Sequence, residues 1–232
     1  MTLKRYPPVF GKNRGIFYGE KRGNVLISGY AGKVLCFWED SYIIHPIYIQ
    51  QNDPVLLGGH YEEKDFAFLQ ALPGRKILMK GNHDYWWTTK KKMDAYLVEK
   101  GLDTLHILSN NSFEYENVAI CGTRGWIFEG GQPQDQKIVA REAGRLKMSL
   151  EDADKRFPGK EKLVFLHYPP VFGNETNESI LQVLKDFGIR RCWYGHIHSA
   201  GCRFALNGEY DGVEYRLISA DYLKFTPKII RL

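Results

Sequence analysis

Lys76-Ile77-Leu78-Met79-Lys80-Gly81-Asn82-His83-Asp84 is the stretch of this sequence that decides its fold class. Its first residues are apolar and predict a short buried strand. Its last three place an amide, an imidazole and a carboxylate on the turn that follows. Open α/β sheets carry their sites on loops at the carboxyl ends of strands. The stretch therefore predicts an α/β fold with a functional site at a strand end.

Two more histidine clusters follow apolar runs further along the chain. His167 comes directly after Leu163–Leu166, and His196 and His198 follow Arg191–Tyr194 after Gly195. In an extended loop the side chains of His196 and His198 project on the same side. Two neighbouring metal ions could each take one of these imidazoles, or one ion could take both.

Hydrophobic periodicity gives the expected elements in chain order. Helices are predicted at Tyr61–Leu72, Thr88–Lys100, Asp135–Phe157 and Glu178–Phe187. Strands are predicted at Lys76–Met79, Leu105–Leu108, Val118–Cys121, Leu163–Leu166, Arg191–Tyr194, Val213–Ser219 and Lys228–Arg231. Strands that alternate with helices indicate an α/β domain, and we expect a single domain over residues 1–232.

Composition excludes several classes of protein. The chain has 232 residues, of which 44% are hydrophobic, and a formal net charge of +5. This charge is too weak and dispersed to predict binding of nucleic acid. No run approaches the roughly 18–20 apolar residues of a membrane span, and the N-terminus lacks the apolar core of a signal peptide. The four cysteines form no CxxC pair, and we expect them to be buried, apolar residues. A cytoplasmic protein without a membrane partner is expected.

The polar residues at these strand ends suit a site with two metal ions. Asn82 offers an amide oxygen, and the later histidines offer imidazole nitrogens. Metal ions about 3.5–4 Å apart can clamp a phosphate and activate water near neutral pH. His83 suggests a different role, because an imidazole beside the Asp84 carboxylate is a plausible general acid for a leaving alkoxide.

In these motifs the chain resembles the calcineurin-like metallophosphoesterases, also called the purple-acid-phosphatase-like superfamily. Gly81–Asp84 is similar to the family's Gly-Asn-His-Asp/Glu motif, His167 to its isolated histidine and Gly195–His198 to its Gly-His-x-His motif. The resemblance covers about residues 54–232. Lys80–Trp87 and Cys121–Trp126 also look like a bacterial subgroup described as predicted phosphohydrolases or Ser/Thr-phosphatase-like proteins. The resemblance implies a sandwich of two mixed β-sheets flanked by helices.

Carried over motif by motif, the resemblance also implies roles for single residues. Asn82, His167 and His196 would bind the second metal ion, and His198 would bind the first. His83 would be the acid, with Asp84 supporting it. The expected cofactors are two divalent ions (Mn, Fe, Zn or Mg), and the expected substrate is a small phosphomonoester or phosphodiester.

The first quarter of the chain departs from the family pattern. The family has an Asp-x-His near its N-terminus and a Gly-Asp before the Gly-Asn-His segment, and neither occurs here. His60 stands where the aspartate of Gly-Asp belongs, and Gly29 and Ala31 could stand in the positions of Asp-x-His. A carboxylate can bridge two cations, whereas a neutral imidazole binds one. The first metal ion would keep only His198 and, if it ligates, His60, so one ion instead of two is an alternative.

Three explanations of residues 1–60 stay open. The segment is a corrupted reading frame that recovers near Glu62, or the protein is a diverged pseudoenzyme, or Asp40, Asp53, His45 and His60 rebuild the site in another geometry. The predicted function is therefore a metal-dependent phosphoesterase, and the alternative is a catalytically inactive binding module on the same fold. Arg124 also has two interpretations, a bidentate contact to substrate phosphate or a structural ion pair.

Overall fold

The computed structural model describes residues 3–5, 17–21, 24–25, 66–67, 69–71, 75–82, 84, 87–126, 133–219, 221–224, 228 and 230. By its internal contacts the chain divides into two compact units, which we describe separately. The first consists of Met1–Leu78, His83–Ile107 and Leu223–Arg231, and the second of Met79–Asn82, Leu108–Tyr222 and Leu232. That the whole chain forms one domain stays a prediction.

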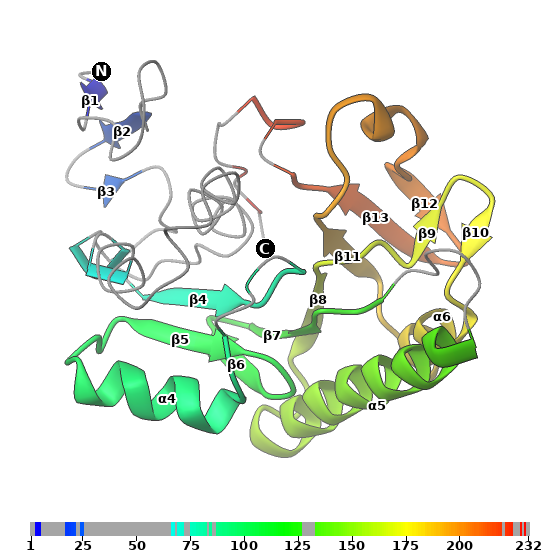
Figure 1. Ribbon diagram of the computed structural model, residues 1–232, viewed down its shortest axis with the longest axis horizontal. Coiled ribbons are helices and arrows are strands. Elements are labelled where there is room, and N and C mark those ends of the chain that lie inside the picture. Colours follow the sequence, from blue (N-terminus) through cyan, green and yellow to red (C-terminus); the bar gives the residue numbers. More distant parts are fainter. Residues whose placement is uncertain are drawn as a thin grey trace. The chain divides into compact units, whose positions relative to one another are not determined.

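The second unit is built on a six-stranded mixed sheet. Its strands are β6 (Ser112–Tyr115), β7 (Val118–Thr123), β8 (Glu161–Leu166), β11 (Arg191–Tyr194), β12 (Gly208–Tyr210) and β13 (Val213–Leu217). They lie in the order β12-β13-β11-β8-β7-β6 (Figure 1). The four central strands run parallel, and the edge strands β12 and β6 run antiparallel to their neighbours. The carboxyl ends of the four central strands therefore meet at one edge.

Apolar side chains explain why these segments form the centre of a sheet. All six residues of β7 and the last four of β8 are buried. Strands covered on both faces read as continuous apolar runs, and only such strands occupy the middle of a parallel sheet. One face of the sheet belongs to a single core cluster that includes Val164, Cys192 and Tyr215.

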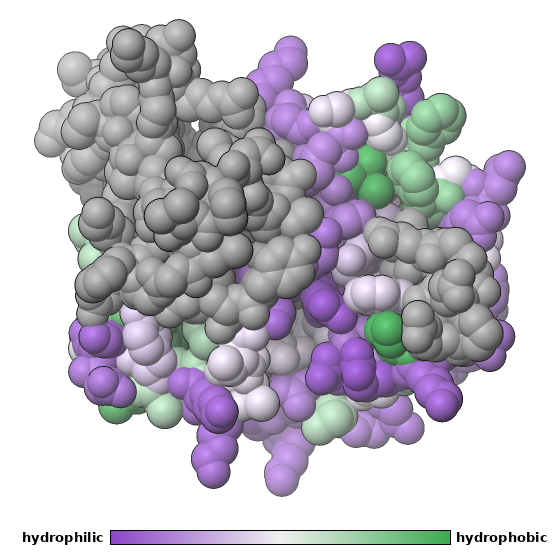
Figure 2. All heavy atoms as spheres, viewed as in Figure 1, coloured by the Kyte–Doolittle hydropathy of each residue, from purple (hydrophilic) through white to green (hydrophobic). Residues whose placement is uncertain are grey.

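Two helices pack into this core. They are α5 (Pro133–Arg156), which packs against β7, β6 and α6, and α6 (Glu178–Asp186). Leu146 and Leu150 of α5 are fully buried, while Lys147 and Glu151 on its outer face lie 3.7 Å apart as an exposed ion pair. Hydrophilic side chains also prevail over the described part of the face in Figure 2. This division of apolar and charged faces is that of an amphipathic helix.

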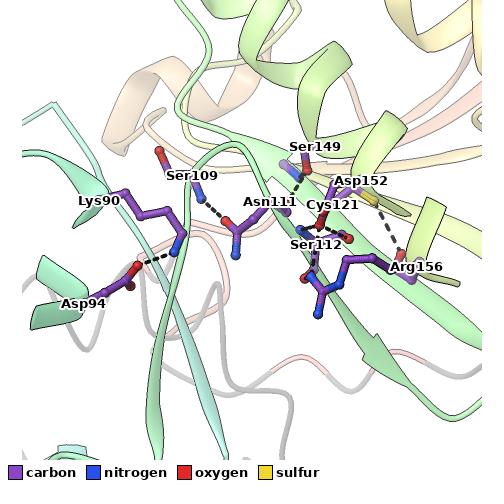
Figure 3. A network of polar contacts seen from close by, with 11 residues as sticks. Lys90, Asp94, Ser109, Asn111, Ser112, Cys121, Ser149, Asp152 and Arg156 are labelled. Carbon is purple, nitrogen blue, oxygen red and sulfur yellow. Dashed lines mark hydrogen bonds and ion pairs between the residues drawn. The ribbon is translucent and has the colours of Figure 1, made fainter. Parts of the chain in front are cut away.

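A polar network ties the edge strand β6 to α5 (Figure 3). The Asp152 carboxylate accepts hydrogen bonds from the backbone N–H and the hydroxyl of Ser112, at 2.8 and 2.7 Å. Arg156 donates to the Ser112 carbonyl at 2.8 Å. Burial opposes ionisation of Asp152, but the hydrogen bonds from Ser112 and Arg156 outweigh burial and lower its pKa. Ser149 joins the network, since its hydroxyl donates to the Asn111 carbonyl at 2.6 Å.

The first unit contains shorter elements. β4 (Lys76–Met79) pairs with β5 (Leu105–Leu108), and α4 (Lys90–Glu99) is capped by the Thr89 hydroxyl. The backbone also forms a three-stranded antiparallel sheet of β1 (Leu3–Arg5), β2 (Phe17–Lys21) and β3 (Asn24–Val25). Residues 66–67 and 69–71 are helical, which agrees with the helix predicted there. Within the described residues, no helix is long and apolar enough to cross a membrane.

The predicted α/β fold class is confirmed, with a few elements corrected. The strands β4, β5 and β11 have the predicted bounds, and α4, α5 and α6 differ from prediction by two residues or fewer at each end. The strand predicted at Lys228–Arg231 is wrong where it can be checked, since Lys228 and Ile230 lie outside any strand. Within the second unit, four short strands were not predicted: β6, β12, β9 (Val171–Phe172) and β10 (Glu175–Thr176).

Candidate metal centre

The carboxyl edge of the parallel strands gathers most of the residues that the sequence singled out. Arg124 follows β7, His167 follows β8, and the Gly195–His198 loop follows β11. Asp221 lies four residues beyond the end of β13. Because the four strands are parallel neighbours, their loops emerge side by side, as in other open α/β sheets.

Backbone hydrogen bonds lock these loops to one another. The Arg124 carbonyl accepts from the N–H of His167 at 3.1 Å and from the N–H of Tyr168 at 2.9 Å. The Gly195 N–H donates to the carbonyls of Leu166 at 3.3 Å and His167 at 3.2 Å. The loop that carries His167 is thereby fixed from both sides, which reduces the conformational freedom of its side chain.

Three polar side chains from three different loops converge at this edge. The Nε2 atom of His167 lies 2.8 Å from Oδ1 of Asn82 and 3.2 Å from Nδ1 of His196. Two donors bound to one divalent ion at about 2.0–2.1 Å lie roughly 2.8–3.4 Å apart in octahedral or tetrahedral geometry. Both distances to Nε2 of His167 therefore fit donors that share one divalent cation. His167 is almost fully buried, so its position is set by packing.

His196 reaches this position through an unusual backbone turn. Its φ is +68°, and the N–H of Ile197 donates to the carbonyl of Gly195 across it at 2.8 Å. This is a γ-turn of the rare, strained hand. The ring of Tyr168 lies 4.2 Å from the ring of His196, so that packing supports the strained turn.

His198 does not join the group of three but contacts a carboxylate. Its Nδ1 lies 3.1 Å from Oδ1 of Asp221. The same carboxylate accepts from the backbone N–H groups of Ser199 at 2.7 Å and Tyr222 at 2.9 Å. Burial opposes ionisation of Asp221, but the hydrogen bonds from Ser199 and His198 outweigh burial and lower its pKa. Asp221 was not predicted from the sequence, although it lies two residues beyond the strand predicted at Val213–Ser219.

Arg124 is held by neighbours on two sides. Its guanidinium lies 4.9 Å from the ring centre of Trp126 and 3.8 Å from Oε1 of Glu142. Glu142 is fully buried and also accepts from Thr123 at 3.0 Å and Arg145 at 2.6 Å. These contacts agree with the ion-pair interpretation of Arg124, and its role in substrate binding stays a prediction.

Other predicted site residues lie partly or wholly outside this group. His83 and His60 are outside the described residues. Asp84 is buried, and its carbonyl accepts from the N–H of Trp87 at 3.2 Å. Within the part of the chain that the structure describes, no three His, Cys, Asp or Glu side chains gather closely enough to hold a metal ion. The third donor of the converging group is therefore the amide of Asn82.

Comparisons with known proteins agree with the motifs. The family model described as calcineurin-like phosphoesterase matches residues 50–200. No curated protein matches this chain. Four solved chains match, and one of them, from a crystal structure, has a TM-score of 0.46 and 13% identity. That match covers 77% of this chain and 72% of the other.

Proposed function

Because this chain belongs to the calcineurin-like phosphoesterase family, we propose that it hydrolyses a small phosphomonoester or phosphodiester with the help of divalent metal ions. Its natural partner is then a small phosphorylated molecule, not a nucleic acid. The net charge of +5 suits an anionic substrate but is too small for a nucleic-acid interface.

One observation carries this proposal. Three donors come from loops after three different strands: Asn82, His167 and His196. Oδ1 of Asn82 and Nδ1 of His196 nevertheless lie 2.8 and 3.2 Å from Nε2 of His167. An amide oxygen and two imidazole nitrogens suit borderline divalent cations such as Zn²⁺, Mn²⁺ and Fe²⁺. We propose that these three side chains hold one of two metal ions.

The second ion would depend on His198 and on residues outside the described part, including His60. Bound divalent cations supply two things in such sites, neutralisation of phosphate charge and a lowered pKa of water. The protein's own contribution is to hold the donors rigidly. Backbone hydrogen bonds fix the His167 loop, and burial fixes its ring.

We further propose that His83 protonates the leaving oxygen and that Asp84 orients it. Asp84 is buried, and a buried carboxylate beside an imidazole stabilises the imidazolium form. Arg124 would lie at the substrate phosphate, with Trp126 and Glu142 restricting its guanidinium.

Hydrolysis of p-nitrophenyl phosphate and bis-p-nitrophenyl phosphate with added Mn²⁺ tests the proposal. We expect metal-dependent turnover that falls at least about 100-fold in the His83→Ala and His167→Ala variants, because each removes a group required for chemistry or metal binding. The matched control is His106→Ala. His106 lies on β5, and its pKa is lowered by burial and by Arg75. Turnover by the wild type no greater than by His83→Ala would refute the proposal.

The alternative is a binding module that keeps the fold without catalysis. It is favoured by the absence of Asp-x-His and Gly-Asp from residues 1–60. Metal analysis of protein purified without chelator separates the two proposals. Two equivalents of metal per chain, together with turnover, would count against the binding module.

A further inference from the structure

We propose that Asp221 is the positioning residue of His198: its carboxylate holds the Nδ1 side of the imidazole so that Nε2 is presented to a metal ion. This inference rests on the proposed function, since it assigns His198 to a metal site. Asp221 lies outside the sequence motifs through which the chain resembles its family.

The contact is built on two neighbouring strands. β11 leads into His198 and β13 leads into Asp221, and these strands are parallel neighbours in the sheet. The N–H of Ile218 donates to the carbonyl of Tyr194 at 2.8 Å, so the pairing continues past the regular strands. The loops after both strands therefore start at the same level, and the 3.1 Å contact between His198 and Asp221 follows from the sheet.

The Asp221 carboxylate is itself held in place. Its Oδ2 accepts from the N–H of Ser199 at 2.7 Å, and its Oδ1 accepts from the N–H of Tyr222 at 2.9 Å. Ser199 is the residue after His198 and has a φ of +52°, a conformation that this hydrogen bond supports. Asp221 thus fixes both the ring of His198 and the backbone that follows it.

The chemistry of the contact selects one tautomer. An ionised carboxylate only accepts hydrogen bonds, so the His198 nitrogen that faces it must carry the proton. That nitrogen is Nδ1, and neutral imidazole then has its lone pair on Nε2, as a metal ligand requires. Carboxylates that accept from the second nitrogen of a metal-ligating histidine typically change metal affinity 10–100-fold when they are removed.

Two measurements test the proposal. The first is long-range ¹H–¹⁵N NMR of histidine-labelled protein without metal, which reports the tautomer of His198. The second is Mn²⁺ titration by electron paramagnetic resonance, with His198→Ala identifying the binding event that depends on His198. In Asp221→Ala we expect the Nδ1–H tautomer to lose its dominance and that same binding event to weaken about 10-fold or more. Asp221→Asn keeps an acceptor oxygen and should give an intermediate loss.

Asp211→Asn is the matched control. Asp211 is an exposed carboxylate 3.8 Å from Lys185, and its φ of +47° suits asparagine. We expect it to leave both readouts unchanged. Affinity within twofold of wild type in Asp221→Ala would overturn the positioning role even if the tautomer changed. Wild-type protein that binds no Mn²⁺, or binds it equally well in His198→Ala, would also overturn it, and only the complete absence of binding would reject the proposed function as well.

Discussion

The polar side chains at the candidate metal centre are held by backbone features as well as by packing. His196 adopts a φ of +68°, which costs a non-glycine residue of the order of 1–3 kcal/mol. The surrounding hydrogen bonds and the Tyr168 ring compensate for this cost. Residues in such conformations cluster at functional sites, so the strain at His196 agrees with its place among the three converging donors.

Gly125, next to the site, also has a positive φ, and this leads to a prediction. Its φ is +71°, and it follows Arg124, whose carbonyl holds the His167 loop. We expect Gly125→Ala to lower the free energy of unfolding by about 1–2 kcal/mol, because a Cβ is disfavoured at this φ. We also expect weaker Mn²⁺ binding, since strain at residue 125 moves the Arg124 carbonyl. Urea unfolding and Mn²⁺ titration measure the two effects.

Gly159 provides the control for this substitution. It has a φ of +79° and no atom within 4 Å of an added Cβ. Gly159→Ala should therefore cost similar stability while Mn²⁺ affinity stays the same. Equal losses of affinity in the two variants would contradict the role of the Gly125 turn.

The histidines of the site, His167 and His196, could be predicted from the sequence, whereas the carboxylate of Asp221 could not. His167 and His196 stand in short motifs directly after apolar runs, so their convergence could be predicted. Asp221 has no such motif, and its importance depends on β13 pairing with β11 and not with another strand. Strand order is a tertiary property, and periodicity along a single chain does not contain it.

β7 and β8 approach each other closely in the sheet. A Cβ added to Gly122 would overlap the carbonyl oxygen of Phe165 on β8. We expect Gly122→Ala to cost about 3 kcal/mol or more in the free energy of unfolding, because neither backbone can move without breaking the ladder. Circular dichroism during urea unfolding measures this loss.

Gly144 on α5 is the matched control. An added Cβ meets nothing within 4 Å there, and the residue lies in the interior of a helix. Gly144→Ala should raise stability by about 0.5–1 kcal/mol, since alanine is the better helix former. A destabilised Gly144→Ala, or a neutral Gly122→Ala, would contradict the packing described above.

The edge strand β6 gives a prediction that depends on pH. The pKa of Asp152 is lowered in the folded state, so its carboxylate stabilises the fold above the ordinary carboxyl pKa of about 3.9. This contribution is lost as the pH falls through the lower, folded-state pKa. Asp152→Asn should therefore cost about 1–2 kcal/mol at pH 7, with a difference from wild type that shrinks towards pH 2.

Glu151→Gln tests whether this effect is specific to the network. Glu151 forms an ion pair with Lys147 at 3.7 Å on the surface of the same helix, and its side chain is 55% exposed. Exposed pairs contribute little, so we expect a change below about 0.5 kcal/mol at either pH. Equal losses in both variants in urea titrations would argue against a special role for the Asp152 network.

The strands that were not predicted from the sequence depend on contacts between distant residues. The strands β4 and β11 consist mostly of apolar residues and were predicted with their observed bounds. The edge strands β6 and β12 have only four and three residues and mix polar with aromatic side chains. They are held by partners distant in sequence, such as Asp152 for β6, and these contacts leave no local pattern.

The missing acidic motifs determine how many metal ions we expect the chain to bind. The family match begins at residue 50, and the two early acidic motifs of the family are missing from residues 1–60. A frameshift would explain this, and resequencing codons 1–65 would detect one. For the chain as it stands, we predict one tightly bound Mn²⁺ and a second, much weaker one, because no bridging aspartate is available from the family motifs.

Metal analysis after dialysis measures this stoichiometry. Asn82→Ala should remove the tight ion, whereas His198→Ala should affect only the weak one. Two tightly bound ions would contradict the prediction and would indicate that residues 1–60 rebuild the first site in another geometry.

Metal binding should also stabilise the folded chain as a whole. A ligand that binds only the native state adds about 2.7 kcal/mol when its concentration is 100 times its dissociation constant. The donors Asn82, His167 and His196 lie far apart in sequence, so an unfolded chain does not bring them together. We therefore expect Mn²⁺ to raise the urea midpoint and a chelator to reverse the shift. His167→Ala should abolish the shift and His106→Ala should retain it, whereas an equal shift in both variants would mean that Mn²⁺ binds elsewhere on the protein.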